Sequence, residues 1–353
     1  MYSKPRENIT TRNLELDIMK GISIILMIFA HTEYVGNAYN LIYSFHMPLF
    51  FLLGGYLSKD NCTLDSFMRY TIKGLKRLLI PYLITMMLIC LWIWRFEILK
   101  FRFNLSLYPI INLLWGSGDF LESYFGTLYV GPVWFLFNMF ITKEIFFLLR
   151  AIIEKYNKTC FSTKWIVIIT SFIISILSII CYPKIEPIPW DFIPGLGALM
   201  FYATGWYMKK CTVPLWMKIV CVICWILAII FGGIDMRVCN YKLLPLDFVG
   251  ALGGVYVVYW ISKKLLQWAR YSFLLNYITL FLRWCGVGSL CVLCMHSLDL
   301  MGGVTSYFIN LLNLICKNKL SFLSYSTLMC NLLLPMLLTY VITKIPLLRK
   351  IFY

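Results

Sequence analysis

Long apolar stretches separated by short polar gaps fill almost the whole chain of 353 residues. A helix needs about 20 predominantly apolar residues to cross the hydrocarbon core of a bilayer, and about ten stretches approach this length. We therefore predict an all-α, polytopic integral membrane bundle of about ten transmembrane helices. The predicted spans lie near residues 16–33, 39–57, 78–95, 131–149, 165–181, 192–208, 218–234, 246–262, 286–303 and 327–345.

The gaps between these spans are too short to hold a separate soluble domain. Residues 1–353 are therefore predicted to form a single transmembrane domain. The longest outer gap, roughly residues 96–130, contains an apolar patch at 107–115. We expect this patch to lie on the outer membrane face as a short amphipathic element, because an irregular loop cannot enter the hydrocarbon.

Composition supports the membrane assignment. Hydrophobic residues make up 61% of the chain and charged residues 14%, whereas soluble domains are about 45–50% apolar and about 25% charged. The mean hydropathy is +0.78. A soluble core cannot hide this much apolar surface, so the chain is predicted to be an integral membrane protein.

The net charge of +16 reflects topology rather than a nucleic-acid partner. If the N-terminus is cytoplasmic, most of the 32 Lys and Arg residues fall in gaps on the cytoplasmic side. By the positive-inside rule, both termini are therefore predicted to be cytoplasmic. The expected location is the cell (plasma or inner) membrane, with the basic residues also contacting anionic lipids.

The first span contains ionisable residues that a lipid-facing helix would not carry. An ionisable group at the bilayer centre costs roughly 2.5–3.5 kcal/mol on insertion scales. Lys20 and His31 are eleven residues apart, which on a helix places them within about 20° of each other and about 16 Å apart along the axis. Asp17 lies close to the same line. This polar stripe predicts a cavity along one face of the helix.

Three histidines occur in the chain, and all fall in the outer half of their predicted spans: His31, His46 and His296. Each could be a hydrogen-bonded packing residue or a metal ligand. However, no set of Asp, Glu or Cys nearby has ligand spacing, so we expect no metal. Proton abstraction needs one base with a pKa near ambient pH, which histidine supplies. We expect the three to lie together as catalytic residues.

Other polar residues have two interpretations each. The basic run that contains Lys73, Lys76 and Arg77 begins the third span at its cytoplasmic end, where it either contacts lipid headgroups or clamps the phosphates of a cosubstrate. Trp134 is either an interfacial anchor or a residue that lines the site. Ser289 shares a helix face with His296, and Asp299 either orients His296 or lies in the outer interface.

Five ordered motifs resemble the membrane acyltransferase 3 family, most closely its branch related to fucose 4-O-acetylase. They are Leu16-Asp17 with Lys20-Gly21 and His31; "FHMPLFFLLGGYL" (45–57); the basic run that leads into Pro81-Tyr82; "WFL" (134–136); and Gly286 with Ser289-Leu290 and His296. The likeness covers nearly the whole chain. Gly54 stands where family members usually have Ser, and Lys20 where many have Arg.

The resemblance implies a ten-helix O-acetyltransferase. Such an enzyme takes an acetyl group from cytoplasmic acetyl-CoA and delivers it to a hydroxyl of an extracytoplasmic or lipid-linked sugar, such as a cell-surface polysaccharide. His31 is then expected to be the general base, assisted by His46 and His296. The expected CoA-binding residues are Lys20, Lys73, Lys76 and Arg77, and the expected substrate-lining residues are Asp17, Trp134 and Ser289.

Two other functional classes stay open at this point. A transporter or flippase for a glycolipid or small metabolite would also carry intramembrane ionisable residues and interrupted spans, but it would be expected to show an internal repeat, and we find none. A glycan polymerase or ligase would be expected to have a large outer loop rich in Arg. The sequence leaves open the acceptor sugar, acetyl versus succinyl as the acyl group, direct transfer versus an acyl-enzyme, and the oligomeric state.

Overall fold

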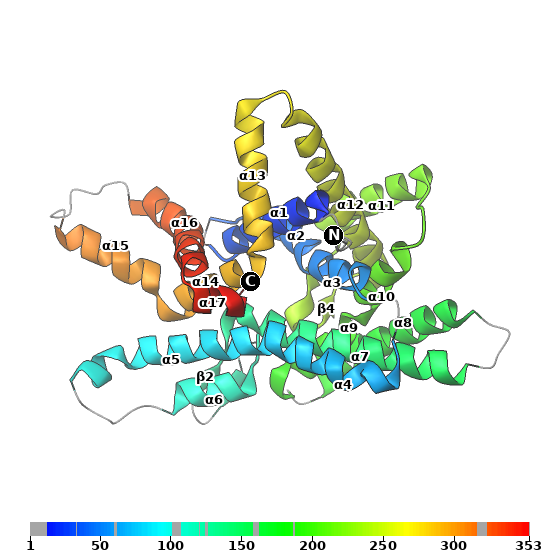
Figure 1. The fold of residues 1–353 in the computed structure, drawn as a ribbon, viewed down its shortest axis with the longest axis horizontal. Helices are drawn as coiled ribbons and strands as arrows, with labels where there is room; N and C mark the ends of the chain where they lie inside the picture. The colour runs from blue at the N-terminus through cyan, green and yellow to red at the C-terminus, as the bar shows by residue number, and fades with distance from the viewer. Residues whose placement is uncertain are drawn as a thin grey trace, which may run out of the picture.

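The computed structural model describes residues 13–32, 34–59, 62–100, 107–119, 121–123, 126–157, 162–185, 188–315 and 323–352. Helices form nearly all of this part of the chain, and its two strand pairs are short (Figure 1). The prediction of an all-α membrane protein is confirmed at this level.

The helices and strands follow one another in short steps. The first half of the chain forms α1 (Leu14–Ala30), α2 (Ala38–Tyr43), α3 (His46–Tyr56), α4 (Leu64–Gly74), the π-helical turn η1 (Leu75–Leu79), α5 (Ile80–Leu99), α6 (Tyr108–Trp115), β1 (Leu121–Ser123), β2 (Gly126–Leu128), the 3₁₀ turn η2 (Gly131–Val133) and α7 (Trp134–Tyr156). The second half forms α8 (Thr163–Cys181), η3 (Tyr182–Lys184), η4 (Pro189–Asp191), α9 (Phe192–Gly197), α10 (Leu199–Met208), α11 (Leu215–Phe231), β3 (Ile234–Asp235), η5 (Met236–Val238), β4 (Asn240–Tyr241), α12 (Leu244–Trp268), α13 (Phe273–Val287), α14 (Ser289–Gly302), α15 (Val304–Ile315), α16 (Leu323–Lys344) and α17 (Pro346–Phe352).

Every predicted span overlaps one helix or two successive helices in the described part of the chain. By length and composition, three helices there can cross a membrane, namely Leu64–Leu99, Thr163–Lys184 and Leu244–Trp268. The number rises to five if each of two bent pairs, α13 with α14 and α16 with α17, forms one span. Ten crossings and cytoplasmic termini stay predictions.

Two helix boundaries differ from the sequence expectation. The third span was expected to begin at residue 78, but α4, η1 and α5 form one helical segment from Leu64 to Leu99. The ninth span was expected to begin at residue 286, but α13 begins at Phe273 and bends by 77° into α14. In both places basic residues, such as Arg283, marked a gap in the hydropathy pattern although the backbone stays helical.

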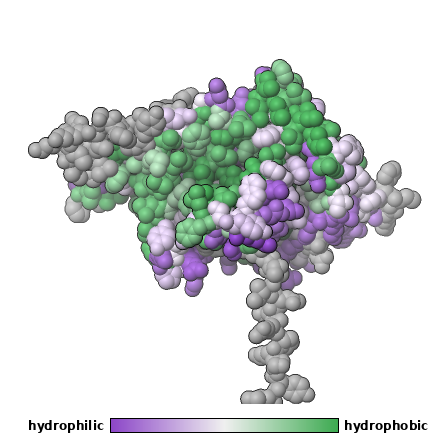
Figure 2. All heavy atoms as spheres, turned by 90° about the horizontal axis from the view of Figure 1, so that it is seen from above, coloured by the Kyte–Doolittle hydropathy of each residue, from purple (hydrophilic) through white to green (hydrophobic). Residues whose placement is uncertain are grey.

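The molecular surface has the character expected of a membrane protein. Figure 2 shows hydrophobic residues over much of one face and hydrophilic residues gathered along its lower edge. Large apolar side chains on α5, α8 and α11 are exposed, for example Leu91, Ile169 and Ile223, each more than half accessible. Lipid tails rather than water suit such helix faces.

The interior is held by close helix contacts and by apolar side chains. A Cβ atom built on Gly21 of α1 or Gly286 of α13 would collide with a backbone carbonyl oxygen of the facing helix. Gly55 and Gly205 bring α3 against α10 in the same way. Small residues let membrane helices approach until their backbones touch, so α1 and α3 are fixed closely against their neighbours.

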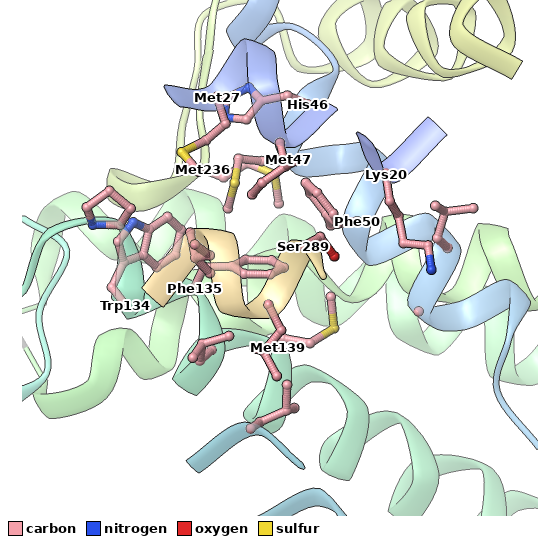
Figure 3. Close-up of a pocket in the computed structure, with 18 of the residues that line it drawn as sticks. Lys20, Met27, His46, Met47, Phe50, Trp134, Phe135, Met139, Met236 and Ser289 are labelled. Carbon is pink, nitrogen blue, oxygen red and sulfur yellow. The ribbon is translucent and has the colours of Figure 1, made fainter. Parts of the chain in front are cut away.

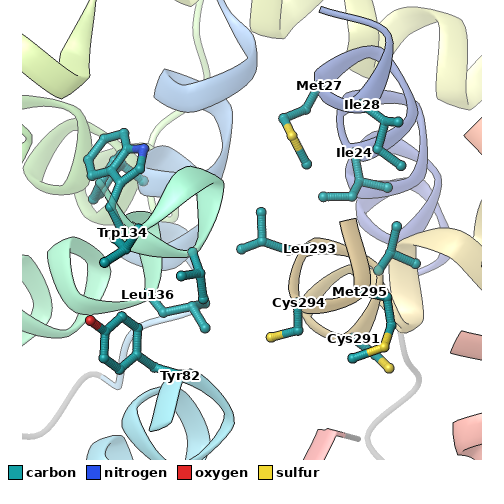
Figure 4. Close-up of a cluster of buried hydrophobic side chains, with 14 of the residues drawn as sticks. Ile24, Met27, Ile28, Tyr82, Trp134, Leu136, Cys291, Leu293, Cys294 and Met295 are labelled. Atoms are coloured by element: carbon teal, nitrogen blue, oxygen red, sulfur yellow. The ribbon is translucent and has the colours of Figure 1, made fainter. Parts of the chain in front are cut away.

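The central hydrophobic cluster lies between α1, α7 and α14. Figure 4 shows Met27 and Leu293 on one side and Trp134 and Leu136 on the other. All four side chains are buried. The packing of this cluster fixes α1 and α14 relative to the start of α7. A cavity lies between the same helices.

Two loop regions close one end of the bundle. Strand β3 pairs antiparallel with β4 through Ile234 and Tyr241, and Asp235 and Asn240. The carboxylate of Asp191, at the end of η4, accepts hydrogen bonds from the Gly118 amide (2.6 Å) and the Ser117 hydroxyl (3.1 Å). Burial raises the pKa of the Asp191 carboxyl to about 7. The residue joins the segment after α6 to the start of α9.

Candidate active site

A cavity of about 610 Å³ lies between α1, α3, α7 and α14 and reaches the β3–β4 hairpin. Figure 3 shows side chains from these elements projecting toward one another, with Lys20 and Ser289 apart from His46 and Trp134. On α1 and the residue that caps its C-terminus, the lining residues are Lys20, Ile24, Met27 and His31. They recur at three- and four-residue intervals, so they form one helix face, as the sequence predicted for Lys20 and His31.

The cavity has two chemically different ends. Helix α3 lines it from His46 to Gly54, and the wall continues to Lys59. Helix α3 packs against α1, and His46 lies within electrostatic range of His31, so the two histidines share one end. Lys20 and Lys59, at the opposite ends of the two helices, belong to the other. We call these the imidazole end and the cationic end.

At the imidazole end, two histidines have the same orientation. Nδ1 of His31 lies 2.8 Å from the carbonyl oxygen of Met27, and Nδ1 of His46 lies 2.8 Å from that of Ile42. A carbonyl oxygen only accepts, so each Nδ1 carries a hydrogen and donates it. In the neutral ring, Nε2 is therefore the lone-pair nitrogen, which is the form a general base requires.

His296 lies beside His31 but is not part of the cavity wall. The ring centroids are 5.3 Å apart and the planes are tilted by 59°. Its side chain is buried, and neither ring nitrogen has a hydrogen-bond partner among the described residues. The idea that Asp299 orients this ring is wrong, because the Asp299 carboxylate accepts from the amide and hydroxyl of Thr305 (2.6 and 2.9 Å).

The cationic end contains part of the predicted set. Lys20, Lys73 and Arg77 line the cavity, whereas the exposed Lys76 does not, because it lies on another face of the helical segment. Asp17 was expected to line the substrate site, but it is not among the residues that line this cavity. It is buried behind the wall, and its Oδ1 accepts a hydrogen bond from Nζ of Lys20 at 3.0 Å.

Two cations at this end were not singled out from the sequence as cosubstrate-binding residues. Lys59 follows α3, and Lys143 lies within α7. Lys143 pairs with Glu144, and its Nζ lies 3.9 Å from the centroid of the Tyr70 ring. The hydroxyl of Thr71 donates to Glu144 at 2.7 Å. The sequence signal that could have identified Lys143 is its position inside an apolar span.

The section between the two ends is apolar, and we call it the waist. It is formed by Ile24 and Met27 of α1 and by Met47 and Phe50 of α3. Trp134 at the start of α7 and Ser289 at the start of α14 also line the cavity, in agreement with the sequence expectation that both face it. Methionine side chains adapt easily to the shape of what lies between them.

A group of polar and aromatic residues at the imidazole end was missed in the sequence. It consists of Tyr39, Tyr43, Tyr129, Asp235 and Arg237. Two signals could have found part of it. Tyr39 and Tyr43 lie seven and three residues before His46, which is helical spacing. Asp235 and Arg237 are charged residues in a gap that hydropathy alone marks only as a loop.

Among the described ranges, no group of three or more His, Cys, Asp or Glu side chains is arranged to hold a metal ion.

Comparison with known proteins assigns the family. The model of the acyltransferase 3 family, an acyltransferase domain, matches residues 13–345. The chain is similar to nodulation protein NolL of Sinorhizobium fredii, 28% identical over 179 residues, which are 48% of this chain and 43% of NolL. It is also similar to NolL of Mesorhizobium japonicum, 27% identical over 158 residues, or 42% and 37% of the two chains. The match spans less than half of either relative. No solved structure matches the chain.

The family match covers the five motifs quoted from the sequence, and the apolar helices agree with a membrane location. The resemblance is thereby confirmed, and the chain belongs to the acyltransferase 3 family of membrane proteins.

Proposed function

We propose that the protein is a membrane O-acyltransferase that moves an acetyl group from cytoplasmic acetyl-CoA to a hydroxyl of an extracytoplasmic or lipid-linked sugar. One observation carries this proposal beyond family membership: one cavity is lined by cations at one end and, at the other, by two histidines whose Nδ1 atoms bond to backbone carbonyl oxygens. Anionic phosphates and an acceptor hydroxyl can thus approach the same space from different ends.

The cationic end suits the phosphates of CoA. Lysine and arginine side chains hold phosphates by charge-assisted hydrogen bonds, and Lys20, Lys73 and Arg77 supply both kinds of donor. Lys76 lies outside the wall, so we assign it no direct contact. Lys20 and His31 are separated by about 16 Å along α1, a distance that an extended pantetheine arm covers. The apolar waist suits that arm and the thioester.

His31 is proposed to be the general base. Its Nε2 takes the proton from the acceptor hydroxyl while the hydroxyl oxygen attacks the thioester carbonyl carbon. Collapse of the tetrahedral intermediate breaks the C–S bond, and the CoA sulfur leaves with the proton that His31 returns. The acetyl ester and CoA thiol are the products, so the protons balance. We favour this direct transfer over an acetyl-His31 intermediate.

The other predicted residues have supporting places in this scheme. Neutral His46 offers only an acceptor at Nε2. Because the reacting hydroxyl gives its one hydrogen to His31, His46 is proposed to accept from a neighbouring hydroxyl of the sugar rather than to stabilise an oxyanion. His296 packs against His31 and is proposed to restrict the orientation of its ring. The Ser289 hydroxyl is a hydrogen-bond donor in the wall on the Lys20 side of the cavity, and it is proposed to contact the bound acyl-CoA.

The test uses purified protein in detergent with radiolabelled acetyl-CoA, a sugar acceptor and a thiol reagent that detects free CoA. We expect CoA release that depends on the acceptor, and a fall of about a hundredfold or more in His31→Ala, the usual loss for a missing general base. Tyr271→Ala, at a site 89% exposed and remote from the cavity lining, serves as the control for abundance and folding. Undiminished transfer by His31→Ala would remove His31 from the mechanism, and a complete lack of CoA release would favour a transporter.

A further inference from the structure

The most informative group that the proposed mechanism does not use is the polar cluster at the imidazole end. Asp235 and Arg237 form an ion pair, with Nη2 of Arg237 3.3 Å from Oδ2 of Asp235. Both side chains line the cavity and are about a quarter exposed there. Both charges lie close enough to act on the His31 ring. The pair therefore stands next to the proposed reaction centre.

The loop that carries this pair is held in place at several points. The Asp247 carboxylate of α12 accepts hydrogen bonds from the amides of Gly233 (2.9 Å) and Leu243 (2.7 Å), at the two ends of the β3–β4 hairpin. Nη1 of Arg237 donates to the carbonyl oxygen of Gly118 at 3.3 Å. A charged pair fixed from two directions can bind a ligand at little cost in side-chain entropy.

An aromatic path leads from the surface to the histidines. Tyr39 is 37% exposed and stacks on Tyr43, with ring centroids 3.9 Å apart. Tyr43 in turn meets His46 edge-on at 4.9 Å. Aromatic side chains offer flat, rigid apolar faces beside polar tips, and these faces fit the C–H surfaces of a sugar ring. Carboxylate and guanidinium groups bind pairs of adjacent hydroxyls in a bidentate manner.

The balance of charges at the imidazole end disfavours acidic sugars relative to uncharged ones. Among the described lining residues of the imidazole end, Arg237 is the permanent cation, and Asp235 neutralises it. Asp119, next to Gly118, adds a further negative charge that acts on Arg237. The contrast with the cationic end is sharp, since lysines and arginine predominate there. An acidic sugar would meet the Asp235 carboxylate with no surplus of positive charge.

Resting on the proposed function, we propose that Tyr39, Asp235 and Arg237 form the acceptor subsite and select an uncharged sugar ring with adjacent hydroxyls. The sugar stacks on Tyr39, its hydroxyls bind the Asp235–Arg237 pair, and one further hydroxyl then reaches Nε2 of His31. Asp235 and Arg237 are specificity residues in this scheme, and they take no part in the proton transfer.

The test compares two soluble acceptors, methyl glucopyranoside and methyl glucuronopyranoside, which differ in one carboxylate. With the parent protein we expect acetyl transfer to the uncharged glycoside to exceed transfer to the acidic one by about tenfold or more in kcat/KM, the size of one lost polar contact. Asp235→Asn keeps the Oδ1 atom that accepts from the Arg237 amide. It is expected to raise the KM for the uncharged glycoside and to narrow the gap to the acidic one, with the KM for acetyl-CoA unchanged.

The control is Lys242→Gln, which removes a charge from the same hairpin outside the cavity wall and is expected to leave both acceptor KM values unchanged. The proposal is overturned if the acidic glycoside is preferred, if Asp235→Asn leaves the preference unchanged, or if CoA is released without acetylation of either sugar. In the last outcome, the proposed use of acetyl-CoA as donor would still hold, and only the proposed acceptor site would fail. Absence of any CoA release from the parent would instead remove the proposed function itself.

Discussion

At the scale of single residues, the cavity depends on partners that hold its polar side chains in one orientation. The Met27 carbonyl sets the tautomer of His31, and Asp17 holds the ammonium of Lys20 from behind the wall. The Asp17 side chain is almost fully buried, whereas Lys20 keeps partial exposure to the cavity. Asp17 is therefore a positioning residue for Lys20 rather than a lining residue.

This arrangement predicts a specific effect of Asp17→Asn. The substitution preserves shape but removes the charge that fixes the ammonium, so Lys20 meets CoA phosphates with a less defined geometry. We expect a KM for acetyl-CoA about fivefold higher, corresponding to about 1 kcal/mol, with kcat changed less than KM. Steady-state kinetics on the purified variant measure both. A fall in kcat at constant KM would contradict a role through Lys20.

At the scale of helices, the position of the site follows from backbone contacts between small residues. Helix α1 carries Lys20 and His31, and it is held against α13 where Gly21 and Gly286 meet the opposing carbonyl oxygens. A shift of α1 by one side-chain thickness would move both residues together. The packing contact thus sets the geometry of the proposed site.

Gly286→Val tests this dependence. A side chain at position 286 would collide with the backbone of α1 near Asp17, so the helices must separate, and we expect a loss of several °C in the thermal midpoint in detergent together with reduced activity. Gly233→Ala is the matched control, because a Cβ there meets only Lys242 at 4.0 Å. Equal midpoints for the two variants would show that α1 is not held at this contact.

The sequence predicted more at this scale than it did for single residues. Periodicity placed helices correctly because apolar spans are long, and it placed Lys20 and His31 on one face because helical spacing is fixed. It could not assign Asp17 to the far side of Lys20, since both lie near one line on the helix and only packing decides which faces the cavity. Asp235 and Arg237 were missed because their approach to His31 depends on the fold of distant segments.

At the scale of the whole molecule, the polarity of the cavity matches the predicted topology. The cationic end collects residues that the positive-inside rule places in the cytoplasm, such as Lys59 and Lys73. The imidazole end meets the loops between α11 and α12, which the same rule places outside. The proposed reaction uses this polarity, because donor and acceptor enter from different compartments.

Reporter fusions test that topology. We expect a fluorescent protein joined after Tyr353 to mature, since it folds in the cytoplasm, and alkaline phosphatase inserted after Lys242 to be active, since it requires the outer side. The reciprocal fusions are expected to be silent. An active phosphatase at the C-terminus would show that the orientation is the opposite of the predicted one. The cationic end would then face away from cytoplasmic CoA.

The apolar waist has one more consequence. A channel that joined two aqueous compartments would let ions leak across the membrane if water filled it continuously. The side chains of Ile24, Met27, Met47 and Phe50 offer no hydration to a passing ion, and hydrophobic sections of a channel can exclude charge by dewetting. In the proposed reaction, the same apolar section accommodates the uncharged thioester arm of acetyl-CoA. Under the proposed function, we expect an acyl group to pass this apolar section while protons and salts are excluded.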